Sequence, residues 1–166
     1  LALGQSTGEI ISVNFGQSGD EAAGTAGVTD YTADNWNNAM GTGGTVADLV
    51  NHLGANTGVS LDWSTNETWR RSEAATTGDE KLMKSFLNDT PPNGDRSQSP
   101  DDPSTVTLSG LPGGSYSLVI YTDGDEDTIN KATVFEVNDG SGTVTVVGND
   151  LVQYPLDGYV LDSGLD

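Results

Sequence analysis

The chain has no cysteine, and only six lysine and arginine residues stand against 25 aspartate and glutamate residues. The absence of cysteine excludes disulfides, thiolate metal sites and cysteine nucleophiles. The scarcity of cations argues against nucleic acid as a partner, because a phosphate backbone requires clustered lysine and arginine. The formal net charge of -19 in 166 residues predicts repulsion from anionic membranes and solubility where salt screens the charge. We therefore expect a secreted protein, extracellular or on the cell surface, in a saline setting.

Other absences narrow the classes of activity. No run of about 18 apolar residues occurs, so we expect no insertion into a membrane. His52 is the only histidine, which excludes multi-histidine metal sites and leaves a Ser-His-Asp triad a single candidate base. Residues 41–44 (GTGG) lack the lysine of a phosphate-binding loop. We expect a protein that is not an enzyme; the catalytic alternative is a two-carboxylate glycoside hydrolase, although no pair of acids is singled out.

What the chain does have is a series of short alternating apolar runs, typical of β-strands. In the first run, Ile11, Val13 and Phe15 occupy one face of a half-buried strand. The run 138–142 contains Asp-Gly between two apolar runs, which predicts a hairpin. Residues 16–32 are rich in glycine and alanine and predict a long surface loop. The predicted strands cover 9–15, 59–63, 106–108, 116–120, 133–137, 143–147 and, as a last short one, 159–161.

Two segments allow a helix. Residues 46–53 fit either a helix that starts after Thr45 or one arm of a hairpin that ends in the 59–63 strand, and we favour the hairpin. Residues 79–88 predict a helix with Thr77 or Asp79 as its cap, ended by the prolines at 91 and 92. The length suits one domain, residues 1–166. The pattern predicts an all-β fold: a jelly-roll-like antiparallel β-sandwich with one or two short helices.

Five segments in this order resemble a β-sandwich module of large exported proteins from planctomycetes and related bacteria. The resemblance covers roughly residues 9–125. It implies a galactose-binding-like or carbohydrate-binding-like fold and an exported protein rather than a particular activity. The segments are 11–16 (ISVNFG), 35–38 (NWNN), 57–63 (TGVSLDW), 78–83 (GDEKLM) and 108–116 (LSGLPGGSY).

The chain departs from that module at its end. The module continues through further strands after the equivalent of Tyr159, whereas here the sequence stops at Asp166. We therefore expect the C-terminal strands of the module to be absent, either because the chain is cut short or because a sheet edge is left open for another chain to complete. An open edge offers a template for another chain. Residues 1–8 are then a candidate N-terminal arm that a neighbouring copy could accept.

The densest acidic cluster is a candidate calcium site. Asp123, Asp125 and Asp127 alternate, and carboxylate oxygens are the ligands that Ca²⁺ prefers. The segment is not an EF-hand, because Thr128 and Val134 stand where that loop needs glycine and glutamate. The alternative is a solvated acidic turn. A second, weaker cluster consists of Asp95, Asp101 and Asp102.

Tryptophans are the candidates for stacking against sugar rings. Trp36 lies between Asn35 and Asn37, and Trp69 precedes Arg70, so each has side chains that can bond hydroxyl groups. Trp63 stands at an inward strand position and predicts a core residue. The alternatives are a structural Trp36 and an Arg70–Arg71 pair that binds nearby carboxylates.

Two functions of different class follow. The first is a non-catalytic, carbohydrate-binding module, with Ca²⁺ as a candidate stabilising ion and a polysaccharide or glycan as the partner. The second is a structural extracellular subunit, a homo-oligomer or filament built through β-edge or donated-strand contacts. An exposed tryptophan on a binding surface favours the first function, and a sandwich strand supplied by another copy favours the second.

Overall fold

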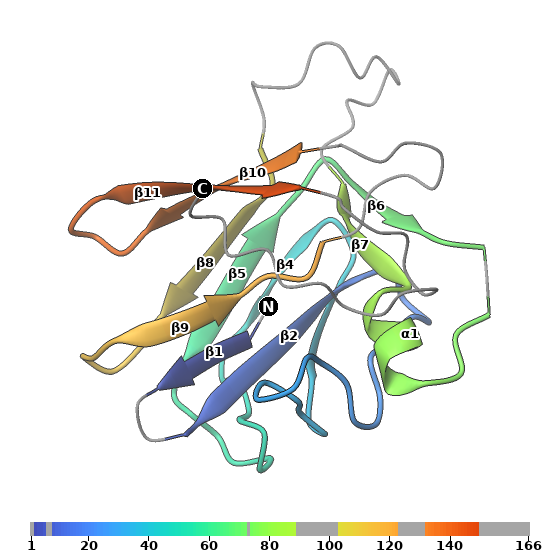
Figure 1. Cartoon of the computed structure of the whole chain (residues 1–166), viewed down its shortest axis with the longest axis horizontal. Coiled ribbons are helices and arrows are strands. Elements are labelled where there is room, and N and C mark those ends of the chain that lie inside the picture. Colours follow the sequence, from blue (N-terminus) through green and yellow to red (C-terminus); the bar gives the residue numbers. More distant parts are fainter. Residues whose placement is uncertain (1, 6–7, 73, 89–102, 123–131, 150–166) are drawn as a thin grey trace. The chain divides into compact units, whose positions relative to one another are not determined.

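The computed structural model describes residues 2–5, 8–72, 74–88, 103–122 and 132–149 (Figure 1). The chain divides into two compact units, Leu1–Ile120 and Tyr121–Asp166, where the sequence predicts one domain. Strands are the predominant regular structure of the described residues, beside one short helix, so the all-β class is confirmed. None of the helical residues described forms a segment long and apolar enough to cross a membrane.

The first unit contains a four-stranded and a three-stranded sheet. The four-stranded sheet has the order β3-β2-β1-β9, and the three-stranded sheet has the order β4-β5-β8. All pairs are antiparallel except β2 and β3, which run parallel. These small sheets do not amount to a clear jelly roll. Their strands are β1 (Ala2–Gln5), β2 (Ile10–Gly16), β3 (Asn37–Met40), β4 (Gly43–Val46), β5 (Ser60–Ser64), β8 (Thr105–Ser109) and β9 (Tyr116–Val119).

The N-terminal segment belongs to the first unit's own sheet. Residues 2–5 form β1, which pairs with β2 on one side and with β9 on the other. These residues lie within the predicted N-terminal arm over 1–8, and the donation of that arm to a neighbouring copy stays a prediction. Strand β2 is also paired on both sides, by β1 and β3. The open edge therefore does not lie at the start of the chain.

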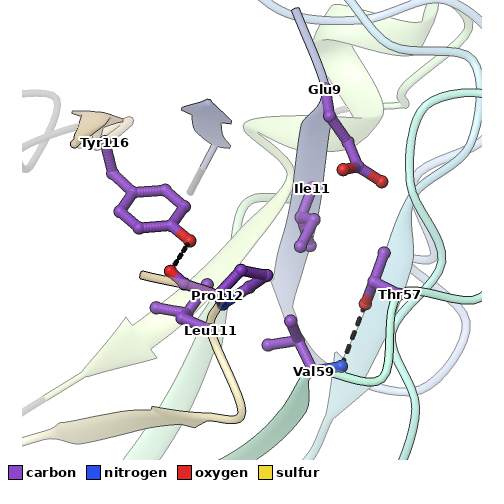
Figure 2. Close-up of a pocket in the computed structure, with 7 residues that line it drawn as sticks. All are labelled: Glu9, Ile11, Thr57, Val59, Leu111, Pro112 and Tyr116. Atoms are coloured by element: carbon purple, nitrogen blue, oxygen red, sulfur yellow. Dashed lines mark hydrogen bonds between the residues drawn. The ribbon is translucent and has the colours of Figure 1, made fainter. Parts of the chain in front are cut away.

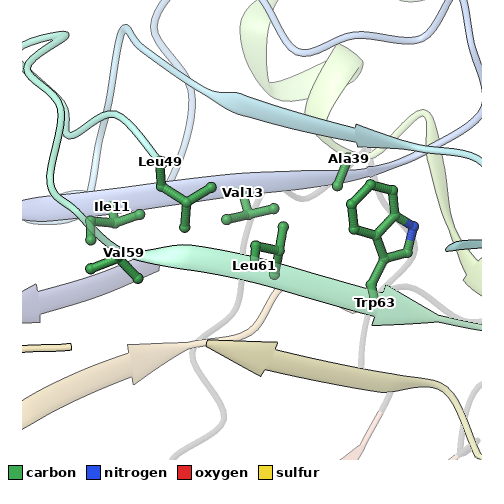
Figure 3. Close-up of a cluster of buried hydrophobic side chains, with 7 residues drawn as sticks. All are labelled: Ile11, Val13, Ala39, Leu49, Val59, Leu61 and Trp63. Atoms are coloured by element: carbon green, nitrogen blue, oxygen red, sulfur yellow. The ribbon is translucent and has the colours of Figure 1, made fainter. Parts of the chain in front are cut away.

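The core lies where side chains of β2 and β5 meet (Figure 3). Val13 and Leu61 are fully buried, and Trp63 packs edge to face against Phe15 with ring centroids 6.4 Å apart. Trp63 is thus a core residue, as its strand position predicts. The seven buried members are Ile11, Val13, Ala39, Leu49, Val59, Leu61 and Trp63.

Strand β2 is buried on both faces, where the sequence predicts a half-buried strand. Ser12 and Asn14 face away from the apolar cluster but are as buried as Val13. Buried polar groups need partners. Asn14 Nδ2 donates to Asp20 O at 3.2 Å and to Asn38 Oδ1 at 3.1 Å. The 16–32 loop, expected on the surface, supplies the cover here and buries Asp20, Ala22 and Ala26.

The predicted helix over 79–88 is shorter than expected. Helix α1 covers only Gly78–Leu82, and Thr77 caps it through a reciprocal capping box with Glu80. Residues after Lys84 form strand β7 (Ser85–Asn88), which pairs with β6 (Glu67–Arg70). Pairing with a distant strand outweighed the local helical pattern. Hydrogen bonds from the Thr77 backbone and from Thr76 lower the pKa of Glu80 to about 2.

The segment 46–53 contains no helix, so the helical alternative is wrong, and the favoured hairpin with the 59–63 strand forms one step earlier, because its arm is β4 and includes only Val46 of this segment. Val46 ends β4 and pairs with Leu61 of β5, while Leu49 is buried in the connection that follows.

In the second unit, β10 (Ala132–Asn138) and β11 (Thr143–Asn149) form the predicted hairpin, with Asn138 opposite Thr143. In its turn, Asp139 Oδ1 accepts hydrogen bonds from Ser141, which lowers the pKa of Asp139. The predicted strand 159–161 and the prolines at 91 and 92 lie outside the described residues.

Candidate binding face

Strands β6 and β7 form a two-stranded ribbon with one half-exposed face. Trp69 stands directly opposite Phe86, and Glu67 stands opposite Asn88. Because side chains alternate along a strand, these four residues share one face. Beyond Trp69, Arg71 N donates to Lys84 O at 2.9 Å, which extends the ladder and adds Arg71 to that face, whereas Lys84 Nζ donates to Arg71 O at 2.6 Å and so lies against the backbone. We call this set the aromatic face: Glu67, Trp69, Arg71, Phe86 and Asn88.

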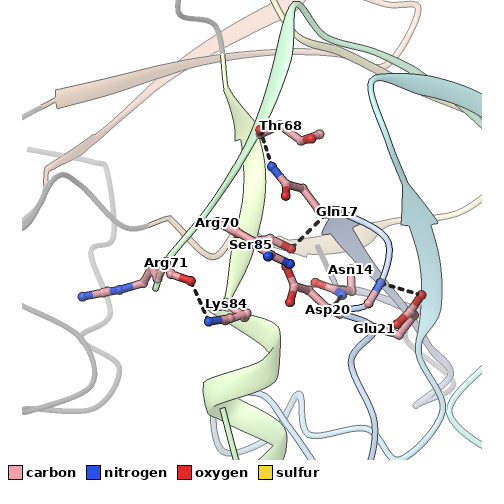
Figure 4. A network of polar contacts seen from close by, with 10 residues as sticks. Asn14, Gln17, Asp20, Glu21, Thr68, Arg70, Arg71, Lys84 and Ser85 are labelled. Carbon is pink, nitrogen blue, oxygen red and sulfur yellow. Dashed lines mark hydrogen bonds and ion pairs between the residues drawn. The ribbon is translucent and has the colours of Figure 1, made fainter. Parts of the chain in front are cut away.

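The ribbon's other face points into the first unit. Ser85 is only 3% exposed, and Leu87 packs against the core, whereas Trp69 is 51% exposed. Arg70, next to Trp69 in sequence, belongs to this inner face. Its Nη1 lies 4.0 Å from Oδ2 of the buried Asp20. Figure 4 shows Arg70 among Asp20, Asn14 and Ser85, while Arg71 points away from that cluster.

Two contacts fasten the ribbon to β2. Gln17 N donates to Ser85 Oγ at 3.2 Å, and Gln17 Nε2 donates to Thr68 O at 2.8 Å (Figure 4). The backbones approach so closely that a Cβ placed on Gly16 would lie 1.7 Å from Ser85 Oγ. Glycine is the residue that permits such an approach. The aromatic face is therefore supported from behind by a rigid strand, which is what a preformed binding surface requires.

Helix α1 is fastened in the same way. A Cβ on Gly78 would lie 2.0 Å from Thr25 O, so the start of the helix presses on the 16–32 loop. Asp79 Oδ1 accepts a hydrogen bond from Gly27 N at 2.8 Å. The connection between β6 and β7 is thus held to the body of the first unit at its middle as well as at its strands.

The Asn35–Trp36–Asn37 group, predicted to contact sugar, lies in the interior. Trp36 is 8% exposed, and its Nε1 donates to Ala33 O at 3.0 Å. Asn37 Nδ2 donates to Ser12 O and Val50 O, and its Oδ1 accepts from Val50 N at 2.9 Å. Asn35 Nδ2 donates to His52 O at 2.8 Å. These polar atoms join β2, β3 and the 49–52 segment, so Trp69 is the tryptophan that presents a surface.

Sequence reasoning missed Phe86 and Asn88, because it assigned them to a helix. It also paired Trp69 with Arg70, which the strand places on opposite faces. The run 67–71 (ETWRR) is polar at every position except Trp69, so it shows no alternation that could have separated Arg70 from Arg71. Arg71, which the sequence grouped with Arg70, is the cation that shares a face with Trp69.

A small pocket lies beside the 110–116 turn (Figure 2). Its volume is about 30 Å³, which suits one or two water molecules and is too small for a sugar ring. Tyr116 closes one side and donates its hydroxyl hydrogen to Pro112 O. Glu9 closes another side, and its Oε1 accepts from Asn51 Nδ2 at 2.8 Å. The hydrogen bonds around the pocket therefore hold the turn in a fixed shape, and the pocket is not a cavity for a sugar.

Of the remaining candidate residues, His52 has a structural role, and the acidic clusters lie in segments that the structure does not describe. His52 Nδ1 accepts a hydrogen bond from Ile10 N at 3.2 Å, and His52 N donates to Ile10 O. Within the described ranges, no group of three histidine, cysteine, aspartate or glutamate residues is placed to hold a metal ion. The candidate calcium ligands Asp123, Asp125 and Asp127 lie outside those ranges, as does the weaker cluster at 95–102.

Comparisons of the chain with models of protein families, with curated proteins and with solved structures found no match. The chemistry of the aromatic face is therefore the basis for a proposed function.

Proposed function

We propose that the protein is a non-catalytic binding module that takes a carbohydrate on the aromatic face. The observation that carries the proposal is Trp69, half exposed on a supported strand and directly opposite Phe86. The C–H groups on one side of a sugar ring form an apolar surface that an aromatic ring can cover. Glu67 and Asn88 stand at one end of the face, where hydroxyl groups of the same sugar chain can reach them.

The dimensions favour a polymer over a small sugar. The pocket by the 110–116 turn is too small for a sugar ring, whereas the aromatic face extends over the whole length of β6 and β7. A surface of this kind contacts several units of a chain laid across it. The non-catalytic role is preferred to that of a glycoside hydrolase, because the residues that the structure describes place no pair of acids beside Trp69 on its face.

Tryptophan fluorescence tests the proposal directly. Trp36 and Trp63 are each 8% exposed, so acrylamide quenching reports mainly on Trp69. A bound polysaccharide should protect Trp69 from quenching. About half of the indole surface is open, and covering about 80 Å² at about 25 cal/mol per Å² contributes roughly 2 kcal/mol. Trp69→Ala should therefore weaken binding about 30-fold.

Leu53→Ala is the matched control, because Leu53 is 76% exposed but lies far along the chain, outside the ribbon. It should leave the affinity unchanged. Equal affinities for the Trp69→Ala variant and the parent, across a panel of neutral and acidic polysaccharides, would remove the aromatic face as the binding surface.

The location, the type of β-sandwich and the calcium ion predicted from the sequence belong to the same proposal. The charge of -19 supports an extracellular or cell-surface protein, and the meeting of β2 and β5 from different sheets supports a jelly-roll-like sandwich. Ca²⁺ remains the proposed stabilising ion, with Asp123, Asp125 and Asp127 as its ligands. Calorimetric titration with Ca²⁺ of the parent and of Asp125→Asn tests that part; equal heats, or none, would exclude these ligands.

A second function, that of a structural subunit, is favoured by one observation. Val106 of the outer strand β8 and Leu118 of the outer strand β9 are each more than a third exposed. Outer strands with exposed apolar side chains are templates for another chain. Light scattering at low and high salt tests it: a monomer under both conditions at high concentration excludes assembly through these edges.

A further inference from the structure

We infer that two copies of the chain pair through the surface formed by β8, β9 and the 110–115 connection, and that salt strengthens the pairing. The inference rests on the proposed function as a structural subunit, for which it names the partner and the arrangement. It comes from the distribution of charge along the sequence and from the positions of β8 and β9 in their sheets.

The surface belongs to a stretch without charged residues. Charged residues make up 19% of the chain, yet residues 103–122 contain none, and no other stretch of this length is free of them. Proteins commonly protect outer strands from other chains with charged residues or proline. Neither Thr105–Ser109 nor Tyr116–Val119 contains a charged residue or a proline. These two strands therefore lack the usual protection against pairing.

The two strands are outer strands of different sheets. Among the residues that the structure describes, β8 pairs with β5 alone and β9 pairs with β1 alone. Val106 of β8 stands opposite the core residue Trp63 but is 40% exposed. Leu118 of β9 lies in the same cross-strand row as the core residue Ile11 but is 37% exposed. Apolar side chains on the core side thus reach the surface at both outer strands.

The 110–115 connection holds the surface in shape. A Cβ on Gly110 would lie 2.8 Å from Gly58 O, so the connection presses on the backbone that precedes β5. Tyr116, at the start of β9, donates its hydroxyl hydrogen to Pro112 O (Figure 2). The surface is therefore formed before any partner arrives, which lowers the entropic cost of association.

A second copy is the partner that fits this surface. A single peptide strand could extend β8 or β9 but not both, because the two strands belong to different sheets. A second copy presents the same two outer strands at the same separation, and a twofold axis lets each surface cover the other. It also brings an uncharged surface to an uncharged surface, so the contact buries no unpaired charge.

Salt enters because the copies repel each other outside the contact. Each copy carries a formal net charge of -19. The Debye length falls from about 30 Å at about 0.01 M salt to about 3 Å at about 1 M. The repulsion therefore fades with salt, whereas the apolar contact does not weaken.

Sedimentation equilibrium of the full chain tests the pairing. We expect dimers and no larger species, with a dissociation constant about tenfold lower, or more, at about 1 M than at about 0.01 M sodium chloride. Leu118→Asp places like charges in the contact and should raise the dissociation constant at the higher salt concentration at least about tenfold. Leu53→Asp is the matched control: it adds the same charge at a leucine that is 76% exposed outside the surface, and it should change the constant less than about twofold at high salt.

A second edge variant guards against misfolding. Should Leu118→Asp melt early, Ser117→Asp replaces it, because Ser117 is exposed on the other face of β9. It should raise the dissociation constant in the same way, since it also faces the second copy across the paired edges. An unchanged dimer in both variants would overturn the inference.

The other outcomes separate the inference from the functions proposed above. Assemblies larger than a dimer that Leu118→Asp still weakens would overturn the twofold pairing and leave the structural-subunit function standing. A dimer that is disrupted by Val134→Asp, at a 60% exposed position of the second unit, but not by Leu118→Asp would overturn the inference. A monomer at both salt concentrations would overturn the inference and the structural-subunit function together, while the carbohydrate-binding function has its own test in Trp69→Ala.

Discussion

The contact between Gly16 of β2 and Ser85 of β7 allows a sharp test of how the ribbon is held. A Cβ added at Gly16 would lie 1.7 Å from Ser85 Oγ and 2.7 Å from Ser85 Cβ. Both residues are buried, so neither side chain can move aside into solvent. Overpacking of this kind costs about 1–3 kcal/mol. Because the backbones themselves must separate, we expect Gly16→Ala to lower the free energy of unfolding by about 3 kcal/mol.

The substitution of the contacting residue, Ser85→Gly, should lower the free energy of unfolding by less than Gly16→Ala does, and for a different reason. Ser85→Gly removes the hydrogen bond from Gln17 N to Ser85 Oγ, worth about 1 kcal/mol. It also places a glycine inside a strand, which costs about another 1 kcal/mol. We therefore expect Ser85→Gly alone to destabilise the protein by about 2 kcal/mol.

The double variant, Gly16→Ala with Ser85→Gly, shows whether the two positions are in contact or affect stability independently. With both Ser85 side-chain atoms gone, the nearest of the contacting atoms is the Ser85 backbone carbon at 3.3 Å, a tight but tolerable distance. The double variant should lose about 3 kcal/mol rather than the sum of about 5 kcal/mol, a coupling of about 2 kcal/mol. Equilibrium unfolding in urea measures all three, with unchanged slopes required for the comparison. Gly113→Ala is the control, because no atom lies within 4 Å of its added Cβ. Additive losses would show that β2 and β7 do not touch at this point.

Three further perturbations test other parts of the fold. Leu61→Ala should cost roughly 2–5 kcal/mol by urea unfolding, since Leu61 is fully buried, whereas Val144→Ala at a 62% exposed position should change stability little. The pKa of Glu80 is lowered from 4.5 to about 2, so its ionised form stabilises the fold above about pH 4.5 and that contribution is lost as the pH falls towards 2. Glu80→Gln should flatten this part of the stability profile, and an unchanged acid limb would contradict the capping box. Thermal midpoints should rise from low salt to molar sodium chloride, because screening weakens the self-repulsion of the -19 charge; a flat or falling series would refute this.

Much of the strand content was predictable from local pattern. The alternation around Val13 and around Leu61 identified β2 and β5, and Asp139-Gly140 identified the β10–β11 hairpin. These predictions succeed because a strand with one buried face must place apolar residues at every second position. Thr77 was also a predictable cap, because its hydroxyl group satisfies the first free N–H groups of α1.

The candidate site was only partly predictable. Trp69 was recognised as a surface aromatic residue, but its partners were not. Phe86 has the spacing of a helix face with Leu82, and only pairing with β6 turns it into a strand residue opposite Trp69. Trp36 looked exposed because its neighbours are asparagines, yet those amides bond backbone atoms of other segments and draw the indole inside.

The amino-acid sequence by itself determined the class of the molecule: an acidic, cysteine-free β protein, with a core of alternating apolar residues and turns set by glycine and proline. Composition and local periodicity suffice for this, because they depend only on neighbouring residues. The tertiary structure alone decided which polar residues are buried, which strands pair, and that Trp69 shares a face with Phe86 and Arg71 rather than with Arg70. Those outcomes depend on contacts between residues far apart in the chain, whose free energies outweigh local preference and leave no local pattern.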